Sequence, residues 1–253
     1  MFLRKIKFQF LLRVTIVLVA TPFFYFAQQE RVKTEKLIIE LEHFVGKEKL
    51  KLESGVYVNE LGQNFIVTNF KYYVGNITLT KTVGKAVEEK NYFLVREDEA
   101  DSKHITINVP AGDYIAITFT IGVDSLHNCS GAQTGALDPV NAMFWTWNTG
   151  YIFLKLEGKS MASSLPGNIF EYHIGGYKAS SNCIRTIKFD LKNKLFVSSG
   201  EKNKIKLKVD AAEILKSPTT IDFSKLPSVT DKNNATTIAD NYKDMFSIID
   251  DEK

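Results

Sequence analysis

The sequence contains few of the residues on which most catalytic and metal-binding motifs depend. Its 253 residues include two cysteines, two tryptophans, four histidines and six prolines. No G-x-S-x-G, H-E-x-x-H, C-x-x-C or P-loop pattern occurs. Each of those patterns carries a defined chemistry, and their absence means that the chain has none of these catalytic motifs. We expect a protein that is not an enzyme.

Long hydrophobic runs are missing outside the N-terminus. There, a basic start is followed by the mostly apolar segment 11–26 and by Ala27. This order is typical of a cleavable secretory signal. Arg13 interrupts a run that is already short for a membrane span. We predict that residues 1–27 are a cleaved signal peptide and that residues 28–253 form a single domain, periplasmic or secreted, with no membrane anchor.

An excess of charge of one sign is also missing. The chain has 32 lysines and arginines against 29 aspartates and glutamates, but its predicted signal holds four of the bases and no acid. The exported protein would therefore carry 28 bases against 29 acids. Nucleic-acid-binding proteins usually present a basic face, so we predict no nucleic-acid partner.

Hydrophobic residues recur with a period of two along most of the chain. Alternation of this kind, with turn residues between the segments, is typical of short antiparallel strands. The expected strands include 65–80, 105–109, 114–121, 184–191 and 205–209. Helical spacing appears mainly at 235–249, where Ile238, Tyr242, Met245 and Phe246 recur. The predicted fold is all-β: an antiparallel β-sandwich with Greek-key-like connections, long loops and a short C-terminal helix.

The segment 122–158 stands apart from this pattern. It holds both tryptophans, His127 and Cys129, and its first part is rich in Asp, Ser, Asn, Gly and Pro. Such a composition forms loops, and loops on a rigid sheet are where binding residues tend to lie. Four residues within it, Asp124, Ser125, Asn128 and Asp138, offer oxygen atoms for calcium, but we favour turn capping as their role.

The two cysteines, Cys129 and Cys183, would meet an oxidising compartment after export. A cysteine pair there more often forms a disulfide than a metal site. We predict a Cys129–Cys183 disulfide, with two free buried thiols as the alternative.

Three of the four histidines, His43, His127 and His173, lie at predicted strand ends or in the loop. Imidazole is a ligand for copper, zinc, iron and nickel. No local spacing forces these three residues together. On the residues alone, isolated hydrogen-bonded histidines are the simpler interpretation, and a shared metal site is the alternative.

Five stretches of the sequence resemble the MbnP-like family, over about residues 37–249. They are FKYYVGNITL (70–79), VPAGDYIAITFTIGVDSLHN (109–128), GAQTGALDPVNAMFWTWNTGYIFLKLEG (131–158), FEYHIGGY (170–177) and IADNYKDMF (238–246). The resemblance implies an exported, all-β protein that binds copper. It also implies a partner, a di-haem peroxidase-like enzyme that oxidises a tryptophan to kynurenine.

The same resemblance implies roles for individual residues. Copper would be bound by His43, His127 and His173, and the site would be walled by Trp145 and Trp147. We add the hypothesis that Asp124 accepts an imidazole N–H and so orients the ring. Two other functions are compatible with the sequence. In one, Trp145 and Trp147 are a stacking platform for a sugar or peptide in a metal-free binding module. In the other, the tryptophans belong to the core of a structural sandwich.

Overall fold

The computed structural model describes residues 33–145 and 150–249. These residues form one compact unit, and the predicted signal peptide lies outside them. No helix in the described ranges is both long and apolar enough to cross a membrane.

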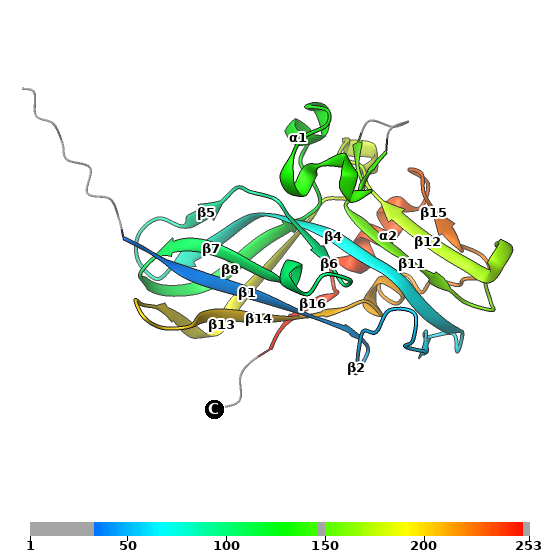
Figure 1. Ribbon diagram of the computed structural model, residues 1–253, viewed down its shortest axis with the longest axis horizontal. Coiled ribbons are helices and arrows are strands. Elements are labelled where there is room, and N and C mark those ends of the chain that lie inside the picture. Colours follow the sequence, from blue (N-terminus) through cyan, green and yellow to red (C-terminus); the bar gives the residue numbers. More distant parts are fainter. Residues whose placement is uncertain (1–32, 146–149, 250–253) are drawn as a thin grey trace, which may run out of the picture. The chain divides into compact units, whose positions relative to one another are not determined.

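The larger of two main sheets is organised around the long strand β4 (Figure 1). Within the described residues its strand order is β13-β8-β4-β11-β12-β15, and three short strands pair with β4 as well. The bounds are β13 (Arg185–Val197), β8 (Gly112–Ile121), β4 (Asn64–Lys81), β11 (Leu154–Lys159), β12 (Ile169–Ile174), β15 (Ser228–Val229), β3 (Tyr57–Val58), β5 (Val87–Glu89) and β6 (Phe93–Arg96).

The smaller sheet has the order β16-β14-β1-β2, with β7 also paired to β1. Its strands are β16 (Phe246–Ile248), β14 (Asn203–Asp210), β1 (Thr34–Val45), β2 (Glu48–Lys49) and β7 (His104–Pro110). A separate hairpin joins β9 (Phe144–Trp145) to β10 (Gly150–Tyr151). The helices and 3₁₀ turns are α1 (Ser125–Cys129), α2 (Ala235–Tyr242), η1 (Ala100–Lys103), η2 (Gly135–Leu137), η3 (Pro139–Asn141), η4 (Pro166–Asn168), η5 (Ala179–Ser181) and η6 (Glu213–Leu215).

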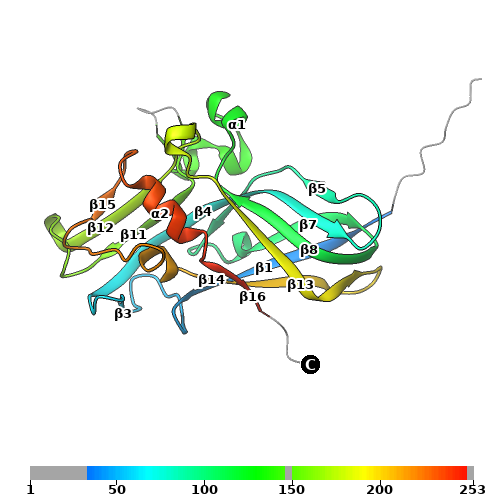
Figure 2. The same ribbon diagram turned by 180° about the vertical axis from the view of Figure 1, so that it is seen from behind.

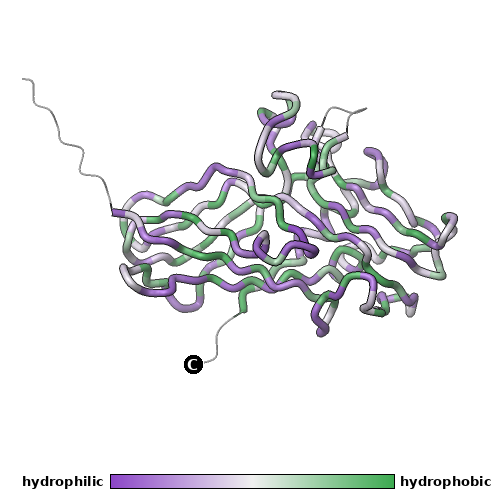
Figure 3. Tube along the Cα trace, in the orientation of Figure 1, coloured by the Kyte–Doolittle hydropathy of each residue, from purple (hydrophilic) through white to green (hydrophobic). Residues whose placement is uncertain are grey.

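The core lies between the two sheets and is rich in aromatic rings. In β1, buried residues alternate with partly exposed ones from Leu37 to Val45, as a half-buried strand requires. Figure 3 shows the same alternation of hydrophobic and hydrophilic residues along the strands. Phe246 of the small sheet contacts Phe119 and Tyr72 of the large sheet, with ring centroids 5.1 and 5.8 Å apart. These contacts join the sheets into the predicted sandwich.

Two features differ from the predicted antiparallel arrangement. First, β1 pairs in parallel with β14, and β12 in parallel with β15, so the sheets are mixed. Second, the predicted helix over 235–249 ends at Tyr242, and residues 246–248 form β16 instead. Strand β16 pairs with β14, and the ladder satisfies the backbone of a segment whose apolar spacing also fits a helix.

The segment between β8 and β11 carries short helical turns rather than an irregular loop. Figure 1 shows α1 above the large sheet. In Figure 2, which shows the molecule from behind, α2 lies beside β12. Helix α1 contacts the β9–β10 hairpin. In this contact, the Asn128 side-chain oxygen accepts a hydrogen bond from the backbone N–H of Tyr151 at 2.9 Å. The fold thus gathers α1, the hairpin and the turns η2 and η3 in one place.

Candidate functional site

Helix α1 begins at a capping aspartate that follows directly from the end of β8. The Asp124 side chain accepts a hydrogen bond from the backbone N–H of His127 at 2.9 Å. Asp138 caps the turn η3 in the same manner, through the N–H of Val140. Aspartate is a preferred N-cap residue because its carboxylate satisfies an otherwise unbonded N–H. The prediction of a capping role for both aspartates is confirmed.

The Asp124 carboxylate also orients the His127 imidazole. Nδ1 of His127 lies 3.0 Å from each carboxylate oxygen, and since a carboxylate only accepts, Nδ1 carries the proton. Within the described residues, no hydrogen-bond partner faces Nε2 of His127, and about a third of the side chain is exposed. This arrangement leaves the Nε2 lone pair available to a ligand.

Tyr92 supports this pair from an adjacent strand connection. Its hydroxyl donates to Asp124 Oδ2 at 2.8 Å and accepts from the Asp124 N–H at 3.1 Å, and its ring meets the His127 ring edge-on at 4.9 Å. Burial by itself raises the pKa of Asp124, but the hydrogen bonds from His127 and Tyr92 outweigh it and lower that pKa. Burial raises the pKa of Tyr92 to about 12. Asp124 is therefore a carboxylate with a fixed orientation.

His43 lies in the core, where both ring nitrogens are occupied. Nδ1 donates to Glu97 Oε2 at 2.7 Å, and the Tyr72 hydroxyl donates to Nε2 at 2.9 Å. Glu97 also accepts a hydrogen bond from Lys103 at 2.9 Å. Burial lowers the pKa of His43, so this imidazole is neutral. The arrangement is that of a hydrogen-bonded core histidine.

His173 pairs with a carboxylate on the neighbouring strand. Its Nε2 lies 2.6 Å from Glu157 Oε1, and the Asn69 amide donates to the other carboxylate oxygen at 2.8 Å. The hydrogen bond from His173 is the main reason that the pKa of Glu157 falls to about 2. A metal could bind His173 only through Nδ1, and 16% of this side chain is exposed, against 34% for His127.

The structure does not bring His43, His127 and His173 together. Among the residues described, no cluster of three or more His, Cys, Asp and Glu side chains is arranged to bind a metal ion. The reason is topological: one histidine lies in β1 of the small sheet, one in β12 of the large sheet and one in α1. Each has a carboxylate partner of its own.

Trp145 is buried, with 4% of its surface exposed. Its ring packs against the backbone of Gly175, where an added Cβ would lie 2.6 Å from the indole. This burial fits the interpretation that Trp145 belongs to the core better than the interpretation that it is an open stacking platform for a sugar or peptide. Trp147 lies outside the described residues.

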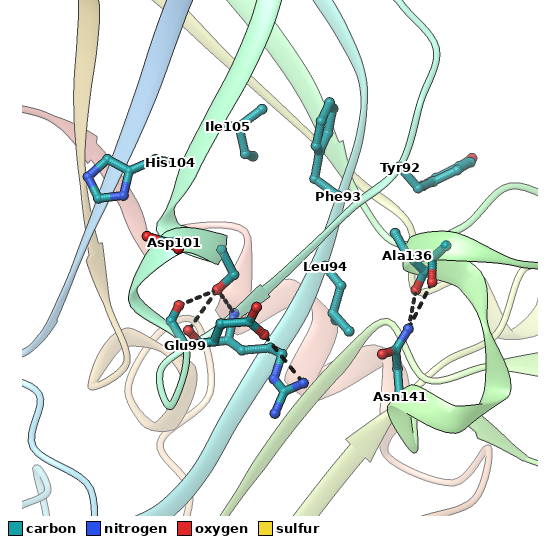
Figure 4. A pocket seen from close by; sticks show the side chains of 12 residues that line it. Tyr92, Phe93, Leu94, Glu99, Asp101, His104, Ile105, Ala136 and Asn141 are labelled. Carbon is teal, nitrogen blue, oxygen red and sulfur yellow. Dashed lines mark hydrogen bonds and ion pairs between the residues drawn. The ribbon is translucent and has the colours of Figure 1, made fainter.

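An open pocket of about 390 Å³ lies beside Tyr92 (Figure 4). Several of its polar groups are bonded to one another. Arg96 pairs with Glu99 at 3.5 Å, the Ser102 hydroxyl donates to the Glu99 carbonyl at 2.7 Å, and the Asn141 amide donates to the carbonyl of Ala136 at 3.0 Å. Since a ligand site needs polar groups that converge on the ligand, we do not place the function in this pocket.

Comparison with known proteins gives the family. A family model described as MbnP matches residues 34–234. The chain belongs to the MbnP family. Its fold is also similar to that of a solved structure, MbnP from Methylosinus trichosporium, with a TM-score of 0.57 and 14% sequence identity, covering 86% of this chain and 99% of that one. No curated protein sequence matches. The predicted resemblance is confirmed.

In this MbnP-family protein, both cysteines are free, so the predicted Cys129–Cys183 disulfide is wrong. Cys129 is exposed, and its thiol faces the Tyr177 hydroxyl at 3.5 Å. Cys183 is fully buried, and burial raises its pKa to about 11. The two sulfurs point into different surroundings, one at the surface and one in the core.

The sequence analysis missed the residues that complete each histidine's environment. Tyr92 and Glu97 are examples, because they lie 32 and 54 residues away from the partners that they contact. Neither residue belongs to a local motif. The Asp124–His127 contact, in contrast, joins residues three apart in sequence, where helical geometry brings side chains together.

Proposed function

We propose that this MbnP-family protein binds copper outside the cytoplasm and that His127 is its principal protein ligand. Membership of the family supports copper binding through the resemblance described above. The observation that carries the choice of residue is the hydrogen bond between His127 Nδ1 and Asp124, which leaves Nε2 without a partner in the described part of the chain.

This pair has the chemistry that a copper ligand needs. Metal-bound histidines commonly donate their other ring N–H to a carboxylate, which fixes the tautomer and raises the basicity of the ligating nitrogen. Imidazole is a suitable ligand for copper. Asp124 would be the orienting carboxylate, and Tyr92 would hold it in place through its hydroxyl at 2.8 Å.

His43 and His173 do not fit the same role in this arrangement. For His43 to bind copper, its hydrogen bonds to Glu97 and Tyr72 would both have to give way inside the core. Loss of such buried hydrogen bonds costs about 1–3 kcal/mol for each unsatisfied group. His173 keeps its Nε2 on Glu157, and with 16% of its side chain exposed, against 34% for His127, it is the less accessible of the two. We therefore propose a site centred on α1 instead of the three-histidine site.

The proposal is one of binding and not of catalysis. The absence of a recognised catalytic motif from the sequence supports this choice. Export through a signal cleaved after Ala27 is part of the proposal. So is a di-haem peroxidase-like partner, and the mass of the tryptophan-containing peptide tests whether that enzyme oxidises Trp145 or Trp147.

Copper competition against a chromogenic Cu(I) chelator tests the site. We expect His127→Ala to lose nearly all copper affinity, and Asp124→Asn to lose about 10- to 100-fold, the range for a residue that orients a metal ligand. His104→Ala is the matched control, because His104 is exposed; its Nδ1 lies 3.2 Å from the Ala100 carbonyl and its Nε2 lies 3.8 Å from Glu40 Oε1. Copper affinity that is unchanged in His127→Ala would show that the site is elsewhere.

A further inference from the structure

A second, more enclosed cavity lies between α1, β10 and the segment 176–181. Its volume is about 170 Å³, and it is lined by Trp145, Tyr151 and Tyr177 together with Lys178 and Lys232. We propose that this cavity binds a small planar organic anion, an aromatic carboxylate in chemical class. The proposal is independent of copper.

Hydrogen bonds hold two of the residues that line the cavity, Asn128 and Tyr151. The amide of Asn128 donates to the carbonyls of Val123 and Asp124, at 2.6 and 2.9 Å, while its oxygen accepts from the N–H of Tyr151. The Tyr151 hydroxyl donates to the carbonyl of Leu137 at 2.8 Å, which fixes the ring. A preformed site binds with a smaller loss of conformational entropy than one that must be ordered.

Gly176 permits the tight backbone turn of the segment 176–181, which lines one side of the cavity. Gly176 has φ of +132°, and a Cβ there would lie 2.3 Å from the Ser181 carbonyl oxygen. The Gly176 carbonyl in turn accepts a hydrogen bond from the N–H of Cys183 at 2.8 Å. The segment is therefore folded closely on itself and forms a fixed wall.

Three aromatic side chains favour a flat ligand. Tyr151 and Trp145 are nearly fully buried, and Tyr177 is partly buried, with its hydroxyl beside the Cys129 thiol. Aromatic rings stack or meet edge-to-face with other rings at centroid distances of about 4.5–7 Å. At about 170 Å³, the space suits a single ring with one substituent.

The charge at the cavity selects an anion. Lys178 and Lys232 come from separate segments, and no acidic side chain lines the cavity within the described residues. Neither lysine forms an ion pair with another residue of the described ranges. The nearest acid in sequence, Asp231, is bonded to the backbone and side chain of Asn233. A carboxylate would gain charge-assisted hydrogen bonds from one or both amines.

Titration of metal-free protein with sodium benzoate, followed by the NMR signal of the Trp145 indole N–H, tests the proposal. We expect saturable binding, at least about tenfold tighter than binding of the neutral benzamide, because loss of one charged hydrogen bond is worth roughly that factor. Inorganic phosphate, which has charge but no ring, should bind more weakly than benzoate. Equal binding of all three probes, or no binding of benzoate, would overturn the proposal.

Lysine variants locate the binding. Lys178→Gln with Lys232→Gln should weaken benzoate binding at least about tenfold, while benzamide binding stays the same. Lys90→Gln is the matched control, because Lys90 is an exposed lysine that lies between β5 and β6. Unchanged benzoate affinity in the double variant would refute the role of the lysines. Copper is absent from these experiments. A failure to bind benzoate therefore does not test copper binding at His127, and a failure to bind copper there does not test benzoate binding.

Discussion

His43 and His127 each donate Nδ1–H to a carboxylate, yet their surroundings give them opposite roles. His43 is buried, and a hydroxyl from Tyr72 occupies its second nitrogen. His127 lies on a short surface helix, and its second nitrogen has no partner among the described residues. The same histidine–carboxylate pair thus has a structural role at His43 and leaves a nitrogen able to bind a ligand at His127. The difference lies in whether Nε2 already has a hydrogen-bond partner.

The largest expected effect that separates the two histidines is on stability. His43→Ala should lower the free energy of unfolding by about 3 kcal/mol, because it leaves a cavity and unsatisfied partners in the core. His127→Ala should lower it by less than about 1 kcal/mol, since that side chain is partly exposed. Denaturant unfolding at neutral pH measures both. Similar losses for the two variants would contradict the comparison.

The next effect is a dependence of stability on pH that comes from the core pair. Burial depresses the folded-state pKa of His43 below 6.5, and the pKa of Glu97 is also lowered, because the hydrogen bonds from His43 and Lys103 outweigh its burial. A depressed pKa gives stability that is present above the unfolded-state value and is lost as pH falls through the folded-state value. Stability should therefore fall from about pH 6.5 downward, by at most about 1.4 kcal/mol per pH unit for one proton.

His43→Gln is the variant that tests the origin of this slope. Glutamine does not titrate, so the loss of stability between pH 7 and pH 5.5 should be smaller than in the wild type. His127→Gln serves as the control and should keep the wild-type slope. A slope that survives in His43→Gln would assign the acid sensitivity to other groups.

A smaller effect is expected from Tyr92→Phe, which removes the hydroxyl that holds Asp124. Loss of this hydrogen bond should cost about 1 kcal/mol of stability and should weaken copper binding less than Asp124→Asn does. Unfolding and copper competition on the same variant measure both quantities. A loss of copper affinity as large as in Asp124→Asn would mean that Tyr92 has a more direct role.

The smallest effect is expected at Cys129. Because its thiol is exposed and not bridged to Cys183, Cys129→Ser should change the free energy of unfolding by less than about 0.5 kcal/mol. A thiol count on the denatured, unreduced protein gives the direct check, with two free thiols expected. A large loss of stability would indicate a disulfide in the exported protein.

The strands were predictable from the sequence because their signal is local. Alternation over 65–80 corresponds to β4 (Asn64–Lys81), and that over 105–109 to β7. The parallel pairing of β1 with β14 was not predictable, since nothing within either strand specifies the direction of its partner. The apolar residues of 245–248 satisfy both helical and strand spacing, and only the neighbouring β14 ladder decides between them.

The site shows the same division between local and distant contacts. The Asp124–His127 pair spans three residues and follows from the helix that Asp124 caps. The partners of His43 are 29 and 54 residues away, in strands or loops that only the folded sandwich brings near. Sequence similarity to the family also suggested a three-histidine site, but topology places each imidazole against its own carboxylate.

The pairing of β1 with β14 also bears on the order in which the chain folds. Leu37 is opposite Asn203, and Phe44 is opposite Asp210, so the first strand obtains one of its neighbours only after more than 150 further residues have been made. Contacts of such separation form late, because a long loop must close before they can be gained. Until residues 203–210 arrive, β1 has an open edge that invites pairing with other chains. During synthesis, this edge of β1 therefore lacks its β14 partner until the last strands are available.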